Sequence, residues 1–403
     1  MTAPRKAHSV AASPEDRRNA QLYLTGLGCS VIGSMALALV AGIWVKSLTG
    51  SSSAAGLVSA CIYVPSLFSP LAGMVADRVA RRRLLVRLSV VSALADLPLL
   101  AVRSAAWVWI VCSVMTWYGT QIVLGDPAED ALFAQMFPQE LRQRVNGLRL
   151  GLQECGRLVA PLVGAGLFAL VGGGAVALVD AATFIVAAVA TVRLRVPDEA
   201  PARPERTHWR AEVLAGYAHI RSTPALARVL GAGMVVMALS GLLVAAQYSL
   251  VQAAGEPPAF LGVFSAVLGA GSVVASLVSS RVLRRVGEQW LAVFGMADFA
   301  AGSALRATGL LGWAIAAMMV LGFAQPWLLL AVINLAQRVT PAELQGRVSA
   351  TVTLALFGSQ APMQALGSLA IRYVTFRQLY TACAIAALMC VAYLAARSAS
   401  RHT

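Results

Sequence analysis

Three carboxylates lie within five residues of an otherwise apolar stretch: Asp126, Glu129 and Asp130, in the run 105–136. Spacings of three and four residues place Glu129 and Asp130 beside Asp126 on neighbouring faces of a helix. If that helix ends near Phe137, Asp126 lies about 16 Å from its end at 1.5 Å per residue. A charge at that depth in a bilayer costs on the order of 2.5–3.5 kcal/mol. The carboxylates must therefore face water, pair with a base or hold a proton, and reversible proton binding is the chemistry they suggest.

Glu154 and Arg157 are candidate partners for these carboxylates. They are three residues apart on one face of the next apolar stretch, 145–171, about 13–18 Å from its first end. A neighbouring arginine favours the charged form of a carboxyl group and burial favours the neutral form, so a group balanced between them can gain and lose a proton. We predict that Asp126, with Glu129 or Asp130 and the Glu154–Arg157 pair, forms a site for proton coupling and cation recognition. The alternative is a structural ion-pair network that holds the two helices together.

The apolar stretches that carry these groups recur along the whole chain. The 403 residues are 58% hydrophobic and 12% charged, about half the charged fraction of a soluble protein, and the mean hydropathy is +0.72. Runs of about 20 residues can cross a ~30 Å hydrocarbon core as helices. Twelve such runs are found, at 20–46, 54–76, 84–102, 105–136, 145–171, 174–194, 225–253, 259–280, 289–308, 312–337, 347–371 and 377–396. The sequence predicts an all-α membrane protein with twelve transmembrane helices.

The net charge of +14 is explained by orientation in the membrane. With the N-terminus in the cytoplasm, 26 of the 32 lysines and arginines fall on cytoplasmic segments or the span ends beside them. This bias is the positive-inside rule, so no nucleic acid or other acidic partner is required. The first nineteen residues contain no apolar core, so we expect no cleavable signal peptide. We predict a multi-pass protein of the inner (plasma) membrane with both termini cytoplasmic.

The sequence shows no motif for metal binding, nucleotide binding or enzymatic catalysis. The six cysteines lie inside predicted spans without ligand-like spacing, and the four histidines lie in tails or in the central polar segment. There is no nucleotide-binding P-loop. We therefore expect no enzyme activity, no cofactor and no metal site.

The two halves of the chain repeat each other at an offset of 203 residues. The segment "DRVARRR" from Asp77 returns as "SRVLRRV" from Ser280, and "PQELRQRV" from Pro138 returns as "PAELQGRV" from Pro341. Both matches need the same offset and no gap. The chain is thus predicted to form two pseudo-symmetric six-helix bundles.

The repeat defines a domain plan. We expect a cytoplasmic tail at 1–19, bundles at 20–194 and 225–397, a cytoplasmic linker at 195–224 and a short tail at 398–403. The linker contains an amphipathic stretch whose apolar stripe is Trp209, Val213, Leu214, Tyr217 and Ile220. This stripe is typical of a helix lying on the membrane surface, and a plain tether is the alternative.

Four segments carry a resemblance to a known family. They are Gly73-x-x-x-Asp77-Arg78-x-x-Arg81-Arg82-Arg83, "GDPAEDALFAQMFPQELRQRVNGL", "LVDAATFIVAA" and "LAGYAHIRSTPALARVL". On these segments the chain resembles the major facilitator superfamily of transporters across nearly its full length. Within it, the chain is similar to the twelve-span drug:proton antiporters, especially the macrolide-efflux-like branch.

The resemblance implies a conformational latch in the first of these segments. In the family, the aspartate and first arginine of this motif engage neighbouring helix ends in the outward-open state, and Asp77 and Arg78 occupy those positions, with Gly73, Arg81 and Arg82 completing the motif. Ser280 replaces the aspartate in the second copy, so we expect the latch in the N-terminal half only.

A second implied motif points to export. The span "GLRLGLQECGRLVAPLVGAG" fits the superfamily's antiporter pattern at Gly147, Gly156, Pro161 and Gly164, while Ala160 and Ala165 replace glycines. Small residues let helices approach closely and proline bends a span, although ordinary small-residue packing is an alternative reading.

The resemblance also implies which spans line the cavity: the first, fourth, seventh and tenth. Candidate wall residues on these spans are Gln121, Gln247, Tyr248, Gln325, Trp327 and Asn334, with helix–helix hydrogen bonding as the alternative role. Antiporters of this kind often carry an arginine in span four, and none occurs between Trp107 and Met136. Asp96 and Asp298 fall in spans that resemble peripheral helices, and we interpret both as structural.

An apolar cavity with few polar groups suits an amphipathic or cationic substrate. We therefore predict a proton-coupled multidrug or natural-product exporter that works by rocker-switch alternating access, with protons and the lipid bilayer as its other partners, and a monomer. The alternatives are a metabolite or siderophore transporter with different coupling, and a transport-dead sensor or assembly partner that keeps the fold.

Overall fold

The computed structural model describes residues 13–68, 79–137, 139–196, 209–341 and 344–399. The elements of the N-terminal half are α1 (Pro14–Thr49), α2 (Ser52–Cys61), η1 (Val64–Phe68), α4 (Arg81–Asp96), η2 (Leu97–Ala101), η3 (Ala105–Trp107), α5 (Val108–Met136), α6 (Gln139–Val171) and α7 (Gly173–Val192). Those of the linker and the C-terminal half are α8 (Trp209–Ser222), α9 (Pro224–Leu242), α10 (Val244–Ala253), η4 (Pro258–Phe260), α11 (Leu261–Ala307), α12 (Leu311–Val339), α13 (Gln345–Gly358), α14 (Gln360–Ala370) and α15 (Phe376–Ala399). No strand occurs in these segments.

Helix α1 begins earlier than hydropathy predicts. Its N-terminus is a capping box: the Asp16 amide donates to the Ser13 hydroxyl at 3.0 Å, and the Ser13 amide donates to the Asp16 carboxylate at 3.1 Å. Pro14 follows at the first helical position, where a missing N–H costs nothing. The helix therefore starts six residues before the apolar run at 20.

Helix α11 contains two of the predicted spans. Its 47 residues are interrupted at Gly287, whose φ of 74° and ψ of 173° are not helical. The Ser272 hydroxyl donates to the Gly322 carbonyl of α12 at 3.1 Å, and Gly302, on the other side of the kink, lies directly against Leu321. Both arms of α11 therefore pack beside α12, and the chain reverses at Gly287.

Two other predicted spans are broken near their middle. Leu243 separates α9 from α10, and Ser359 separates α13 from α14. The two spans touch where they bend, since Gly367 lies directly against the carbonyl of Leu242. Any side chain at residue 367 would push them apart.

Nine helices of the described segments are long and apolar enough to cross a membrane. One of them is the α11 hairpin, which contains two predicted spans, and another is α9, while the α2–η1 and α13–α14 segments consist of shorter pieces. The elements are consistent with the twelve predicted spans. The all-α membrane fold predicted from the sequence is confirmed.

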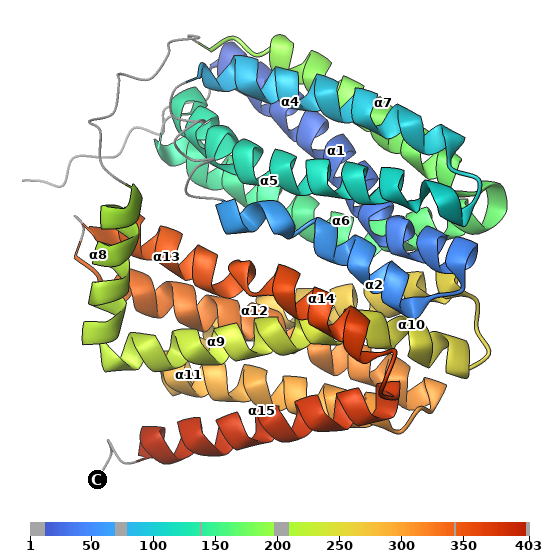
Figure 1. The fold of residues 1–403 in the computed structure, drawn as a ribbon. Coiled ribbons are helices and arrows are strands. Elements are labelled where there is room, and N and C mark those ends of the chain that lie inside the picture. The colour runs from blue at the N-terminus through green and yellow to red at the C-terminus, as the bar shows by residue number, and fades with distance from the viewer. Residues whose placement is uncertain (1–12, 69–78, 138, 197–208, 342–343, 400–403) are drawn as a thin grey trace, which may run out of the picture.

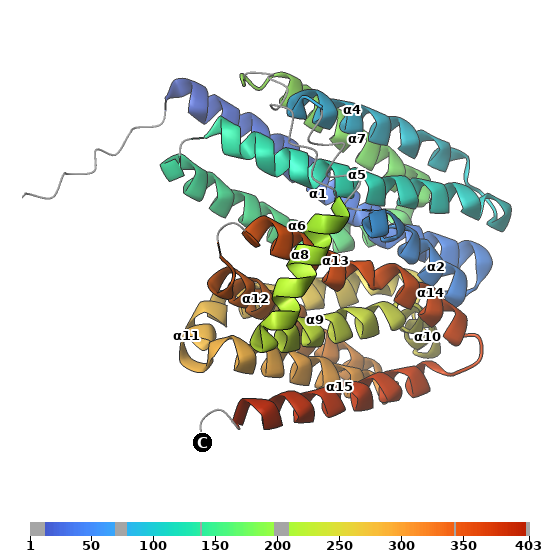
Figure 2. The same ribbon diagram turned by 60° about the vertical axis from the view of Figure 1, so that its left-hand side comes forward.

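The helices form two bundles, one from each half of the chain. In Figure 1 the N-terminal half lies above the C-terminal half, and Figure 2 shows the same division from another side. Helix α8 lies at one end of the molecule, which we call the α8 end; the end where α1 finishes at Thr49 is the Lys46 end.

The halves are held together mainly at the Lys46 end. Hydrogen bonds at this end join residues of opposite halves. The Lys46 ammonium donates to the Gln252 side chain at 2.6 Å, and Arg372 donates to the Ser53 hydroxyl at 3.1 Å. Ile43 and Ala55 of the N-terminal half are also buried in the apolar core of the C-terminal half.

Helix α8 packs against α13 with part of the predicted stripe. Gly216 lies directly against Arg347 and Thr351 of α13, and Ile220 is buried, whereas Leu214 and Tyr217 are exposed. The side of the helix that carries Gly216 and Ile220 therefore faces the protein, and the edge that carries Leu214 and Tyr217 stays open.

Candidate functional site

An acid–base cluster ties three helices together near the α8 end of the N-terminal bundle. The Tyr23 hydroxyl of α1 donates to Glu129 Oε1 of α5 at 2.6 Å. From α6, Arg149 Nη1 donates to Asp130 Oδ1 at 2.6 Å, and Arg149 Nε lies 3.6 Å from Glu129 Oε1. The first two are strong hydrogen bonds to charged groups, and the third is an ion pair without a hydrogen bond.

The surroundings of this cluster are apolar and aromatic on one side. The Arg149 guanidinium lies 5.8 Å from the centre of the Phe133 ring, and the Tyr23 and Phe133 rings are 5.5 Å apart. Arg149 is 15% exposed and Glu129 is 23% exposed, whereas Asp130 is 65% exposed. One carboxylate of the cluster is therefore open to water and the other is half-enclosed, and both depend on a single arginine for neutralisation.

Asp126 lies one helical turn from this cluster, towards the Lys46 end. Its side chain is exposed, and it makes no hydrogen bond or ion pair with any described residue. Pro127 follows it inside α5, and a proline there leaves a backbone carbonyl one turn earlier without its helical partner. Asp126 is thus an accessible, unpaired carboxylate deep in a span.

The structure separates the predicted Glu154–Arg157 pair from these carboxylates. Arg157 Nη1 lies 3.3 Å from Glu154 Oε1 on the same helix, with the arginine 58% exposed. Exposed ion pairs of this spacing stabilise a helix by only about 0.2–0.5 kcal/mol. The base that meets Glu129 and Asp130 is Arg149, two turns earlier on α6, and Arg157 pairs within its own helix.

The antiporter-motif residues lie on the faces of α6 that pack against α1 and α11. Gly156 lies against Val31 and Gly164 against Ala36, both on α1. The Pro161 carbonyl lies against Gly262 of α11, so this part of α6 also contacts the other half. Gly147 has open space around it. Three of the four motif positions are therefore close helix contacts.

Replacing Gly164 by alanine should destabilise the protein. The added Cβ would lie 2.8 Å from the Ala36 Cβ and 3.0 Å from its Cα, so α6 and α1 must move apart. Overpacking of this kind costs about 1–3 kcal/mol. We expect Gly164→Ala to lower the melting temperature of the purified protein, whereas Gly147→Ala, at a motif position with free space, leaves it unchanged. Equal melting temperatures would show that the α1–α6 contact tolerates a side chain.

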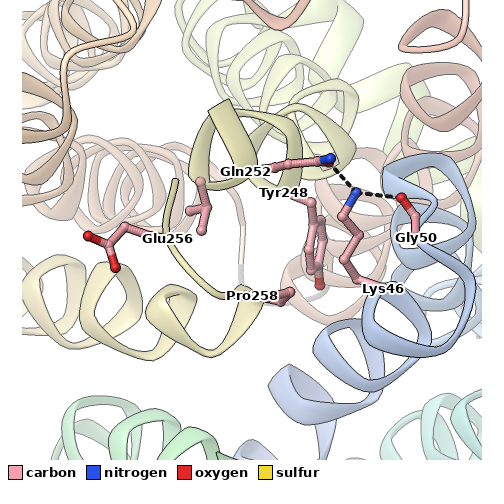
Figure 3. A pocket seen from close by; sticks show the side chains of 7 residues that line it. Lys46, Gly50, Tyr248, Gln252, Glu256 and Pro258 are labelled. Carbon is pink, nitrogen blue, oxygen red and sulfur yellow. Dashed lines mark hydrogen bonds between the residues drawn. The ribbon is translucent and has the colours of Figure 1, made fainter. Parts of the chain in front are cut away.

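At the Lys46 end, a cavity of about 220 Å³ lies between the halves. Figure 3 shows the Lys46 ammonium between Gln252 and the Gly50 carbonyl, with Tyr248 and Pro258 beside it and Glu256 pointing away. Lys46 is 6% exposed and also donates to the Ser52 hydroxyl at 3.0 Å. A buried ammonium held only by neutral oxygens is costly unless every donor is satisfied, and here all three donors are used.

The predicted cavity-wall residues fall into two groups. Tyr248 is buried against Gly42 at the Lys46 end, the Trp327 indole donates to the Ala275 carbonyl of α11 at 3.3 Å, and the Asn334 amide donates to the Leu330 carbonyl of its own helix at 2.9 Å. In this state these three lie in helix contacts. The remaining three are partly or fully exposed: Gln121, Gln247 and Gln325.

Of the predicted latch, Gly73, Asp77 and Arg78 lie outside the described residues. Arg81 and Arg82 begin α4, and Arg82 Nη1 donates to the Leu194 carbonyl after α7 at 3.0 Å. This bond joins the start of α4 to the residues just after α7, within the N-terminal bundle.

Sequence reasoning missed Tyr23, Arg149 and Lys46 as candidate functional residues. In the positive-inside pattern Arg149 is one of the cations at cytoplasmic span ends, and Lys46 is one of the six that lie elsewhere. Tyr23 and Arg149 lie inside their helices, whereas Lys46 lies in the last turn of α1.

The described chain forms two helical bundles, one from each half, with charged groups inside several of the helices. Residues 23–362 match the sequence model of the Major Facilitator Superfamily, so the chain belongs to that family and is a transporter. The predicted family is confirmed.

Sequence similarity to named relatives is limited. The chain is 24% identical over 175 residues to macrolide efflux protein A of Streptococcus pyogenes, and this match spans 43% of either chain.

Solved structures share the fold over nearly the full length. A mutant of the nucleoside transporter NupG has a TM-score of 0.77 at 13% identity, covering 94% of this chain and 99% of that one. A POT family transporter in complex with a thioalcohol-conjugated peptide has a TM-score of 0.76 at 12% identity, covering 95% and 96%. An inward-facing, unoccupied bacterial homologue of the human lysosomal transporter Spinster has a TM-score of 0.68 at 13% identity, covering 95% and 97%. At such identities the likeness shows the fold alone.

Proposed function

We propose that this transporter exports amphipathic or cationic small molecules, such as drugs or natural products, in exchange for protons. The observation that carries the proposal is the accessible Asp126 beside the Tyr23–Glu129–Asp130–Arg149 cluster. An unpaired carboxylate can attract a cationic substrate or take up a proton, but not both at once. Competition between the two ligands for this region would couple their movements.

The arrangement of the halves supports alternating access. The contacts of Lys46 and Arg372 join the halves at the Lys46 end. If the positive-inside bias gives the orientation, the α8 end faces the cytoplasm and the conformation is inward-facing. Substrate would then reach Asp126 from the cytoplasm or the inner leaflet, and rocking of the bundles would expose it on the other side.

Export rather than import is supported by two observations. The α6 motif that the resemblance links to antiporters forms close contacts with α1 and α11, and the partial similarity to macrolide efflux protein A points the same way. We propose a plasma-membrane location, both termini cytoplasmic, and a monomer as the functional unit.

Transport by proteoliposomes with an acidic lumen tests the proposal. We expect a labelled macrolide or a lipophilic cation added outside to accumulate in the lumen, and a protonophore to abolish this accumulation. Flux that is equal with and without the pH gradient would contradict proton exchange. Flux of a nucleoside or a peptide, with none of the macrolide or lipophilic cation, would instead indicate a metabolite transporter. A folded protein that moves none of these would support the sensor alternative.

A further inference from the structure

Two buried carboxylates face a common helix contact away from the Glu129–Arg149 cluster. Asp96 ends α4 and is 4% exposed, and Asp180 lies on α7 and is 1% exposed. Ala93, one turn before Asp96, packs in a single apolar cluster with Ala181, the residue after Asp180. The two acids therefore approach each other across the α4–α7 contact.

Neither carboxylate is fully satisfied. Asp180 Oδ1 accepts from the Ser34 hydroxyl of α1 at 3.4 Å, and it lies 3.3 Å from the Thr183 hydroxyl, which also donates to the Asp180 backbone carbonyl at 2.7 Å, so both contacts with Oδ1 are weak. The Oδ2 atoms of Asp96 and of Asp180 are buried without any hydrogen-bond partner. Helix α1 passes so close that a Cβ on Gly33 would lie 2.5 Å from Asp180 Oδ1, so glycine leaves room for the acid.

No base neutralises the pair. Among the described residues, neither carboxylate forms an ion pair, and the groups that act on them electrostatically include no lysine, arginine or histidine. The hydroxyl groups near the pair belong to Ser34 of α1 and Thr183 of α7. Among the described residues, η2 beside α7 has only apolar side chains, and no group of α6 acts on either carboxylate. From α5, Tyr118 interacts with Asp180.

Two ionised carboxylates in this setting would repel each other and lose their hydration without compensation. A single proton removes the repulsion and one of the two buried charges, and the protonated acid becomes a donor to the carboxylate that remains. A metal ion is a poorer match, because it needs about six oxygen ligands and the carbonyls of these helices are already used.

We propose that Asp96 and Asp180 together bind one proton and form a buried acid pair in the N-terminal bundle, separate from the Glu129–Arg149 cluster. The pair is connected to the accessible side of the bundle. Tyr118 lies beside Ser34 and within electrostatic range of both Asp180 and Asp126. Ser34 and Tyr118 thus offer hydroxyl groups along which a proton can pass between the pair and Asp126.

Infrared spectroscopy of the purified protein at neutral pH in sodium-free buffer tests this proposal, because a protonated carboxyl group has a carbonyl absorption that a carboxylate lacks. We expect Asp96→Asn and Asp180→Asn each to remove the absorption of one carboxyl group per protein, and the double variant to remove no more than either alone. Asp130→Asn, which changes an exposed acid already paired with Arg149, should leave the absorption intact.

Three results would overturn the proposal: additive losses from the two single variants, which mean two separate protons; no loss from either; or an absorption suppressed by added sodium, which means a sodium site. Two milder variants cover the case in which the asparagine variants fail to insert. Ser34→Ala and Thr183→Val keep both acids and remove only hydroxyl donors, so they should shift the frequency of the same absorption. An unchanged frequency in both would assign the absorption to other carboxyl groups and overturn the proposal.

Discussion

Replacing Arg149 by methionine should strongly reduce proton-coupled transport while the protein still inserts into the membrane. Among the described residues, Arg149 is the cation that forms ion pairs with Glu129 and Asp130, and it is mostly enclosed. Leaving a half-buried charge without its partner costs about 1–3 kcal/mol. The half-enclosed Glu129 would then be neutralised by a proton that it no longer releases. Because 1.4 kcal/mol is a factor of ten, we expect proton-driven flux to fall by about 5- to 150-fold.

The matched control is Arg157→Met on the same helix. Arg157 is exposed and, among the described residues, forms an ion pair only with Glu154, so its loss should leave flux within about twofold. Arg149→Lys should retain part of the activity, because an ammonium group can meet one carboxylate but lacks the fork that reaches two. Flux measured in proteoliposomes under an imposed pH gradient distinguishes these cases. Equal losses in the two methionine variants would assign the effect to α6 as a whole and contradict a specific role for Arg149.

The contrast between Arg149 and Arg157 shows how a site residue was missed although the sequence contained the information. Helices α5 and α6 form an antiparallel hairpin around residue 138, so residues equally far from the turn lie side by side. Glu129 and Arg149 are nine and eleven residues from that point. Arg157 is nineteen residues away, about 12 Å deeper than Arg149 at 1.5 Å per residue. Spacing along one helix suggested Arg157, whereas register across the hairpin indicates Arg149.

The helices themselves were largely predictable because hydropathy alone determines which segments can cross a bilayer. The positions where the helices break could not be predicted. Two apolar spans that are continuous in the sequence are interrupted at Leu243 and Ser359, and Gly367 of one packs against Leu242 of the other. Contacts of this kind join segments that are far apart in the chain, so the sequence around each break does not indicate them.

The partners of Lys46 were unpredictable for a similar reason. Gln252 lies 206 residues later in the chain, and the two meet only because the bundles close at this end. From the sequence, Lys46 is one more charge near a span end. In the structure it is a charged link between the halves, which makes it a direct test of alternating access.

Replacing Lys46 by methionine should shift the protein towards a conformation open at the Lys46 end. Methionine keeps the length of the side chain and removes the ammonium group that bonds to Gln252 across the halves. A hydrogen bond to a charged group contributes about 1.5–3 kcal/mol. It is lost only from the closed conformation, because in the open one water reaches both partners. The ratio of open to closed protein should therefore rise by about 10- to 100-fold.

Distances between spin labels on the two halves measure this shift. In a cysteine-free background, Leu170→Cys and Tyr373→Cys place labels on exposed residues at the Lys46 end, one in each half. Lys46→Met should add or enlarge a population with a longer distance. The control is Glu256→Gln, which changes a charged residue lining the same cavity, whose side chain makes no hydrogen bond with any described residue. Because Glu256 points away from Lys46, this variant should keep the original distribution. A distribution that Lys46→Met leaves unchanged would mean that packing of Ile43 and Ala55 in the opposite core closes this end, and that the lysine only satisfies its own buried charge.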